Sequence, residues 1–446
     1  MKRREFVKKT AVFAAGGLVV PFILPTGRLF ARTNTPKADH VVVVIFGGGL
    51  RQQDSISQRY LADSQGFNVE GNILYNILEG AAPSSKIAYG TTPAGSPKGS
   101  QPIPKLLSQS IQKQGTIFAE MRAISGGHYG GLNSVMTGSG VEGQGLKVRP
   151  VNPTMFEYAR KFGGFKATDT WFVGNGIGNS TPLLNSSKHP DFGLNYGANF
   201  FAPSVTFGGD GRATLANAKI YHPQEELEPM YKMKNFLDNT FNIKAGDIPG
   251  IKNTDEEKTR VKDFIDETFR RQMLGQIPSP PVGGGDSSTI GYAAEVLRVF
   301  KPKLLVVNMS NIDGCHSDFT GYLQAMHKAD HAMGFLWNYI QTQIPEMSGK
   351  TIMTFVPECG RNLKHNPILD ENDWFGYDHG DANSLRVFGG MVGQNVPSNL
   401  MVGSESSPIG KVTDITLTVA DILGFKDEVV AAGIIDSQAR SLFDRI

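Results

Sequence analysis

The sequence predicts an α/β fold with a mostly parallel central sheet that helices cover on both faces. Short apolar runs rich in β-branched residues, typical of buried parallel strands, recur along the chain, and segments with helical periodicity lie between them. Strands that alternate with helices favour parallel pairing. With 446 residues, 40% of them hydrophobic and 19% charged, the chain is long enough for one large domain of this class or two smaller ones.

The predicted elements begin with a buried strand. The VVVVIF run at residues 41–46 ends in three glycines, Gly47 to Gly49, which allow the backbone to approach a ligand closely. Further strands are expected at residues 116–121, 168–174, 303–309 and 351–356. Helices are expected after the Gly-rich turn at 126–140 and at 153–163, 289–300, 321–344 and 411–425. We expect the five strands to lie side by side in one sheet.

Three segments depart from this alternation. Residues 72–115 are rich in Pro, Ser and Gly, which predicts surface excursions with short helical pieces. Residues 180–215 are polar, aromatic and irregular, which predicts a loop layer over the site. Residues 222–276 have a helical period and an apolar stripe that is typical of core packing. The domain is therefore expected to carry loop and helical insertions at about 180–290.

The first 31 residues have the pattern of a targeting segment. Paired arginines at positions 3 and 4, then Phe6 and Lys8, precede a short apolar run at 11–24, and Ala31 is the expected cleavage point. This pattern resembles a twin-arginine signal peptide; an uncleaved N-terminal anchor is the alternative. Residues 32–446 are then expected to be exported folded by the twin-arginine translocase, to the periplasm or the extracellular space.

The charge pattern gives no indication of nucleic-acid binding. The formal net charge is +2, no basic run occurs outside residues 2–9, and basic residues do not interleave with aromatic ones. A second hydrophobic span is also missing from the sequence, so no transmembrane domain is expected after signal removal.

Two polar segments near the C-terminus predict the functional site. The strand at 304–307 is followed by Asp313 and His316, and the strand at 351–356 by Glu358, Cys359 and Arg361; the segment GYDHGDANS then supplies Asp378 and His379. Because ligands bind at the carboxyl ends of strands in an open α/β sheet, we expect these side chains to share one crevice. Carboxylates, imidazoles and an arginine suit a divalent metal with an anionic group beside it.

The remaining metal-binding residue types leave alternatives open. Cys315 and Cys359 are the only cysteines, and they are either small buried residues, thiolate ligands or a disulfide pair. His327 and His331 have the i, i+4 spacing of a helical metal site, but we expect them on a polar face without a metal.

The order of these motifs resembles the alkaline phosphatase/sulfatase superfamily, from residue 40 to the C-terminus. It is most similar to an exported branch catalogued as domain-of-unknown-function family 1501. That branch combines a twin-arginine signal with an Asp-x-His-like motif, a Ser-Glu-Phe-Gly-Arg motif and an Asp-His-Gly-x-Ala-Asn motif. The corresponding segments here are residues 312–316, 357–361 and 378–383.

The resemblance implies roles for individual residues. Asp313, His316 and His379 would form one metal site, which suits zinc, with manganese, iron or calcium as other possibilities. Glu358 would lie where the superfamily holds a second metal carboxylate, and Cys359 where its phosphatases have His. The guanidinium of Arg361 would clamp an anionic oxygen on the rim of the crevice.

Some positions depart from the superfamily pattern. The first strand ends in glycines in place of a metal-binding Asp, and the next carboxylate is Asp54. Ten residues before Gly138, where the resemblance places the nucleophile, stands His128, with Ser125 three residues earlier. His128 is expected on the rim of the crevice, as nucleophile or general acid, or as a structural residue.

Two functions are compatible with this pattern. The first is a metal-dependent hydrolase of a phosphate or sulfate ester, with a small anionic ester as its substrate. The second is a non-catalytic descendant of the fold that binds a ligand or partner in the periplasm or at the cell surface. The Asp-His-Gly cluster favours the first, whereas the changes at Gly47 and His128 favour the second.

Overall fold

The computed structural model describes residues 34–59, 72–83, 88–89, 102–140, 149–175, 181–203 and 253–446, and the backbone of a short antiparallel pair, β1 (Phe22–Ile23) and β2 (Leu29–Phe30). The rest of the predicted signal, and the part of the predicted helical segment 222–276 that precedes residue 253, lie outside these residues. In the part of the chain that the structure describes, no helix is long and apolar enough to cross a membrane.

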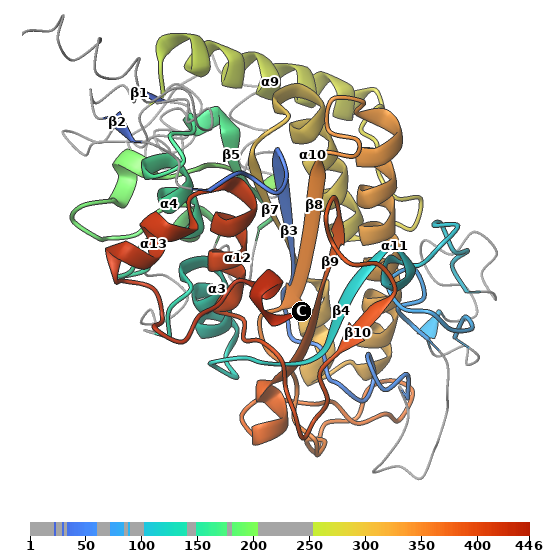
Figure 1. Ribbon diagram of the computed structural model, residues 1–446. Helices are drawn as coiled ribbons and strands as arrows, with labels where there is room; N and C mark the ends of the chain where they lie inside the picture. Colours follow the sequence, from blue (N-terminus) through green and yellow to red (C-terminus); the bar gives the residue numbers. More distant parts are fainter. Residues whose placement is uncertain are drawn as a thin grey trace, which may run out of the picture.

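The centre of the fold is one eight-stranded sheet in the order β10-β4-β9-β8-β3-β7-β5-β6 (Figure 1). The strands are β3 (His40–Phe46), β4 (Gly115–Arg122), β5 (Thr170–Val173), β6 (Asn199–Phe201), β7 (Leu304–Met309), β8 (Thr351–Pro357), β9 (Arg386–Gly393) and β10 (Leu400–Val402). Only β9 runs against its neighbours; all other pairs are parallel. The predicted α/β class with a mostly parallel sheet is therefore confirmed.

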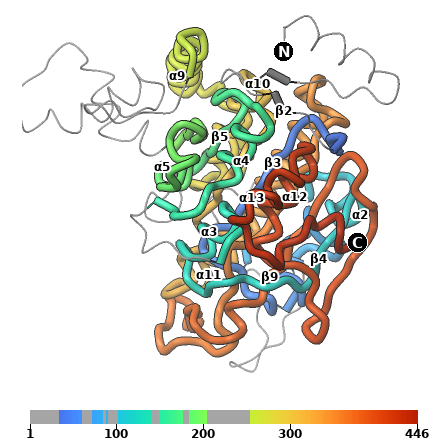
Figure 2. The backbone as a smooth tube through the Cα atoms, turned by 60° about the vertical axis from the view of Figure 1, so that its left-hand side comes forward, coloured from blue at the N-terminus to red at the C-terminus, as the bar shows by residue number. Residues whose placement is uncertain are grey.

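Helices cover both faces of this sheet (Figures 1 and 2). One layer contains α10 (Gly285–Phe300) and α11 (Phe319–Gln343), with α9 (Asp255–Met273) beyond it. The other contains α3 (His128–Thr137), α4 (Met155–Lys161), α12 (Asp414–Leu423) and α13 (Lys426–Ala432). Shorter helices are α2 (Ile111–Gln114) and α5 (Thr181–Leu184).

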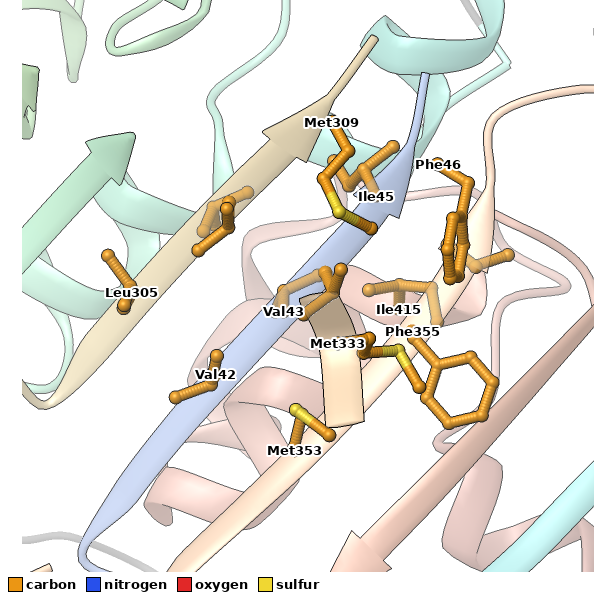
Figure 3. Packing of buried hydrophobic residues seen from close by; sticks show 14 of the residues in the cluster. Val42, Val43, Ile45, Phe46, Leu305, Met309, Met333, Met353, Phe355 and Ile415 are labelled. Atoms are coloured by element: carbon orange, nitrogen blue, oxygen red, sulfur yellow. The ribbon is translucent and has the colours of Figure 1, made fainter. Parts of the chain in front are cut away.

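The core is built on both sides of β3. All seven residues of this strand are buried, because it lies between β7 and β8 and under helices on each face. Figure 3 shows Met333 of α11 and Ile415 of α12 packed around Val43 and its neighbours. A strand that is buried on both faces needs a continuous apolar run, which explains why apolar and polar residues do not alternate at positions 41–46.

Two expectations about the segments between these elements are wrong. Residues 72–115 are not only surface excursions, since Ile73, Leu74 and Ile77 are buried in the core. Residues 180–215 do not form only a loop layer, since β6 within them is the edge strand of the sheet. In both places, tertiary packing outweighs the Pro, Gly and polar composition of the segment.

Candidate metal centre

The candidate centre lies at the carboxyl edge of the parallel strands. The short helix η5 (Asn311–His316) follows β7, Glu358 follows β8, and three glycines follow β3. Strand β4 ends at the same edge, so α3 starts there. Strand β9 runs the other way and starts there, so His379, a few residues before it, is delivered to the same place. Residues from five parts of the chain thus meet at one site.

Gly48 brings η5 against the end of β3. Its φ is +113°, and a Cβ at this position would lie 2.3 Å from the backbone nitrogen of Asp313. No side chain fits at this position, so the backbone of η5 lies directly against the end of β3. The Gly48 N–H instead donates a hydrogen bond to Glu358 Oε1 over 2.6 Å.

His128 is the first residue of α3 and occupies the middle of the site. Its Nδ1 lies 2.9 Å from Glu358 Oε1, its Nε2 lies 2.8 Å from Asp313 Oδ1, and only 10% of its side chain is exposed. The helix approaches β8 this closely because Gly131 has no side chain: a Cβ there would lie 2.4 Å from the Glu358 carbonyl oxygen. His128 was expected on the rim, and this position corrects that expectation.

Two further imidazoles face His128. The ring of His379 lies 4.3 Å from that of His128 and 5.0 Å from that of His316, measured between centroids. One nitrogen of each of the three rings lies within 4.8 Å of the others. The Nε2 atom of His316 is 3.6 Å from Asp313 Oδ1, and its Nδ1 is 2.6 Å from Asp378 Oδ1.

The charges at the site are arranged around Asp313. Burial alone would raise the pKa of this carboxyl, but His128, Arg361 and His316 lower it to about 2. Burial likewise opposes the charge on His128, yet its contacts with Asp313, Cys359 and Glu358 hold its pKa well above the usual range. Burial and the cationic neighbours lower the pKa of His379 to about 4, so this ring is neutral at pH 7.

A second group of potential ligands lies on the Nδ1 side of His128. Glu358 and Cys359 are both fully buried, and the ligand atoms of His128, Glu358 and Cys359 lie within 4.8 Å of one another. The Cys359 sulfur is 3.6 Å from His128 Nδ1. The side chain therefore points into the site, as a thiolate ligand would have to. Burial and Glu358 raise the pKa of this thiol.

The cysteines do not form a disulfide; both are free and buried. Burial raises the pKa of Cys315 to about 12, which keeps this residue a neutral thiol. The backbone carbonyl of Cys315 accepts a hydrogen bond from the Tyr377 N–H over 2.9 Å. Cys315 therefore corresponds to the alternative of a small buried residue.

Arg361 lies beneath the site, whereas it was expected on the rim. Its side chain is fully buried. The guanidinium donates hydrogen bonds to the carbonyl oxygens of Gly48 and Tyr377 and, over 3.1 Å, to Asp313 Oδ1. These contacts tie the end of β3 and the loop before His379 to Asp313.

The other candidate residues lie elsewhere. Asp54 is fully buried in an ion pair with Arg51, 3.0 Å away. The Ser125 hydroxyl accepts a hydrogen bond from the Gly127 N–H over 3.1 Å, in the turn before α3. His327 and His331 are buried, so the expectation of a polar face is wrong. Both ring nitrogens of His327 contact backbone groups.

Sequence reasoning did not assign a role to Asp378. Its carboxylate contacts His316, and that contact lowers the pKa of Asp378. The sequence placed Asp378 beside His379 in the expected crevice, but nothing in it indicated the contact with His316.

The donor atoms present fit a divalent metal. Imidazole nitrogens and a carboxylate oxygen are the ligands that zinc prefers in open, catalytic sites. His128 Nε2 is buried 2.8 Å from Asp313 Oδ1, with no well-formed hydrogen bond to any of the described residues. A buried polar atom in this position is consistent with an ion that completes its contacts.

Comparison with known proteins gives structural likenesses only. No protein-family model and no curated protein matches the sequence. Similar solved structures include an alkaline phosphatase superfamily protein from Vibrio parahaemolyticus (11% identity, TM-score 0.37), which covers 95% of this chain and 76% of its own. The PsFucS1 sulfatase from Pseudoalteromonas sp. has 11% identity and a TM-score of 0.45, and the match covers 92% of this chain and 72% of the sulfatase. The alkaline phosphatase from the Antarctic bacterium TAB5 has 13% identity and a TM-score of 0.41, and the match covers 87% of this chain and 98% of the phosphatase.

Proposed function

We propose that this protein is a metal-dependent hydrolase of a phosphate or sulfate ester. The observation that carries the proposal is the convergence of one nitrogen each from His128, His316 and His379, within 4.8 Å of one another, beside the carboxylate of Asp313. The side chains of Asp313 and His316 are 34% and 38% exposed, so the centre opens to solvent on this side.

Each residue has a distinct role in this proposal. His379 is neutral at pH 7 and offers a free lone pair, while Asp313 is ionised and supplies the negative charge. Zinc is the expected ion, with manganese, iron or calcium as the other candidates. A divalent ion bound by these residues would supply Lewis-acid chemistry toward an ester oxygen and a water nucleophile. Arg361 acts from below, by holding Asp313 in place.

His128 is assigned to the metal and not to the attacking group. Its two ring nitrogens both face carboxylates, so neither has the free access to substrate that a nucleophile needs. We therefore assign Nε2 of His128 as a ligand. Glu358 and Cys359, on the Nδ1 side and fully buried, support this ring from behind.

The test combines metal content with hydrolysis. Purified parent protein is expected to contain about one equivalent of a transition metal, and a chelator-stripped sample to regain hydrolysis of an aryl phosphate or aryl sulfate when zinc is added. His379→Ala should lower both metal affinity and hydrolysis. His189→Ala is the matched control, because His189 contacts Asp191 and Phe192 instead of the centre. A parent protein without metal that gains none on titration would end the proposal.

The second candidate is a non-catalytic binding protein of the same fold. The position of His128 favours it, since an imidazole that contacts two carboxylates stands where the resemblance places a nucleophile. In that case the protein binds metal and an anion but releases no product from either ester. Binding of inorganic phosphate or sulfate in isothermal titration, by a zinc-loaded protein that hydrolyses neither aryl ester, would favour this second function; hydrolysis of either ester would exclude it.

We also propose that residues 1–31 are a twin-arginine signal and that residues 32–446 form the mature domain, with the insertions at about 180–290. The paired arginines followed by an apolar run support this assignment. Fractionation of cells that express the full chain should recover a shortened protein in the periplasm or the medium. Replacement of both arginines by lysine should retain it in the cytoplasm; export of that variant would contradict the assignment.

A further inference from the structure

Two histidines of the candidate centre each have a carboxylate on the side that faces away from it. In His316, Nδ1 lies 2.6 Å from Asp378 Oδ1, and in His128, Nδ1 lies 2.9 Å from Glu358 Oε1. In both rings the opposite nitrogen, Nε2, faces the same oxygen, Asp313 Oδ1, over 3.6 Å and 2.8 Å. The two rings are therefore held in the same way from two different parts of the chain.

We propose that Asp378 and Glu358 are positioning residues, which accept a hydrogen bond from Nδ1–H of His316 and His128 and so present Nε2 to the metal. This inference rests on the proposed metal centre and deepens it. A neutral imidazole has one donor and one acceptor nitrogen, and the hydrogen bond that one nitrogen makes decides which of them carries the lone pair. A carboxylate on Nδ1 also makes Nε2 a more basic ligand.

The surroundings of His316 show that its orientation is fixed by the loop between Arg361 and Asp378. The Asn366 side chain donates to the His316 carbonyl oxygen over 2.8 Å. A Cβ at Gly376 would lie 2.4 Å from the same oxygen, so this loop packs directly on the His316 backbone. The loop then delivers Asp378 to the ring of His316, so backbone and side chain are held by the same segment.

The surroundings of Glu358 indicate the same role for a residue first expected to be a ligand. Its Oε1 atom accepts from the Gly48 N–H over 2.6 Å as well as from His128. The side chain is fully buried, whereas that of Asp378 is 48% exposed. Because solvent screens the Asp378 pair more strongly, we expect the Glu358 pair to make the larger contribution and the Asp378 pair to be the easier one to vary.

The first test needs neither metal nor substrate. In chelator-stripped protein labelled with ¹⁵N-histidine, the imidazole spectrum at about pH 8 should show the neutral ring of His316 as the Nδ1–H form. Asp378→Ala should shift it toward the Nε2–H form, which free histidine prefers. Glu371→Gln is the matched control: it removes a carboxylate from the same exposed loop and should leave the spectrum of His316 unchanged.

The second test measures zinc affinity by competition with a chromophoric chelator. Asp378→Ala should weaken zinc binding about 10–100-fold, which is the usual effect of removing such a partner, and Asp378→Glu should restore part of the loss. Glu371→Gln should bind zinc like the parent. If the tautomer changes but no variant binds zinc, the positioning role stands and the metal centre fails. An unchanged tautomer together with unchanged zinc affinity in Asp378→Ala would overturn the inference.

Glu358→Gln separates positioning from direct ligation. The amide oxygen can still accept from His128, so a positioning role predicts a moderate loss of zinc affinity, within the same 10–100-fold range, and a Co²⁺ absorption spectrum like that of the parent. A changed Co²⁺ spectrum would show that Glu358 is itself a ligand and would overturn its assignment. Asp378→Ala and Glu358→Gln are both compared with the parent by urea unfolding, so that only folded variants are assessed.

Discussion

Substitution of Gly48 by alanine tests whether the end of β3 determines the position of Asp313. The new Cβ would lie 2.3 Å from the backbone nitrogen and 2.7 Å from the Cα of Asp313, and real Cβ atoms do not approach backbone this closely. Backbone atoms cannot rotate away as a side chain can. Either η5 moves away from β3 or the glycine loop changes its path, and both displace Asp313 from His128.

The cost can be estimated from two contributions. An alanine at φ +113° is strained by about 1–2 kcal/mol, since left-handed backbone is unfavourable for residues with a Cβ. Overpacking against a buried backbone adds about 1–3 kcal/mol. Gly48→Ala should therefore lower the free energy of unfolding by about 2–5 kcal/mol, and it should weaken zinc binding because a ligand is displaced.

The matched control is Gly314→Ala. Gly314 is one residue from Asp313, its φ is not positive, and a Cβ there would meet nothing within 4 Å. The free energy of unfolding of this variant should lie within about 0.5 kcal/mol of that of the parent, as is usual for substitutions at exposed positions. The assay is urea unfolding of chelator-stripped protein, followed by zinc titration. Equal stability and equal zinc affinity of Gly48→Ala and Gly314→Ala would refute the reasoning.

Three further outcomes follow from the charges and burial at and near the site. The two carboxylate neighbours of His128 raise the pKa of its imidazole, so zinc must displace a proton when it binds there. The affinity for zinc should therefore rise by up to about tenfold per pH unit between about pH 6 and 8. Calorimetric titrations with zinc in buffers of different ionisation enthalpy measure the number of protons released. Cys359→Ser should leave zinc affinity unchanged, whereas a large loss, measured by the same chelator competition, would identify a thiolate ligand. Asp330→Asn should destabilise the protein by about 1–3 kcal/mol for each donor left unpaired, since the buried carboxylate accepts from the backbone of Asn76 and Ile77. Burial raises the pKa of Asp330 to about 7, so between about pH 4 and 7 the folded state keeps a proton that the unfolded state has released. The parent protein therefore loses stability as the pH rises through this range. In urea unfolding, the parent should be more stable than Asp330→Asn by a larger margin at about pH 5 than at about pH 8.

The sequence predicted five of the eight strands of the sheet, among them those buried on both faces, and missed β6, β9 and β10. Of these three, β9 shows most clearly how a strand can depend on its neighbours. The runs of β3, β7 and β8 consist mainly of apolar residues, a pattern that indicates a buried strand even when its partners are unknown. Strand β9 contains Gly389 and Gly390, which reduce strand propensity. Their purpose is tertiary: a Cβ at Gly390 would lie 2.3 Å from the ring of Phe355 on β8. No local pattern could show that requirement.

At the site, too, local sequence predicts some features and tertiary packing determines the others. Asp313, His316 and Glu358 follow predicted strands, so their convergence could be expected from the sheet alone. His128 was found by its spacing from Gly138, but its central position depends on how closely α3 packs on β8 at Gly131. The contact between Asp378 and His316 is made by a loop, and loop paths are not encoded in strand periodicity. Burial of Arg361 likewise follows from the path of the glycine turn at Gly48.

The central position of β3 also has a consequence for the order of folding. This strand is among the first parts of the domain to leave the ribosome, yet its partners β7 and β8 begin only at Leu304 and Thr351. Pairing over such long stretches of chain is slow, because the loop must close before any contact is gained. An apolar strand therefore stays without its partners until most of the chain has been made. We expect newly made protein to depend on chaperones during this interval and to gain metal affinity only at the end of folding.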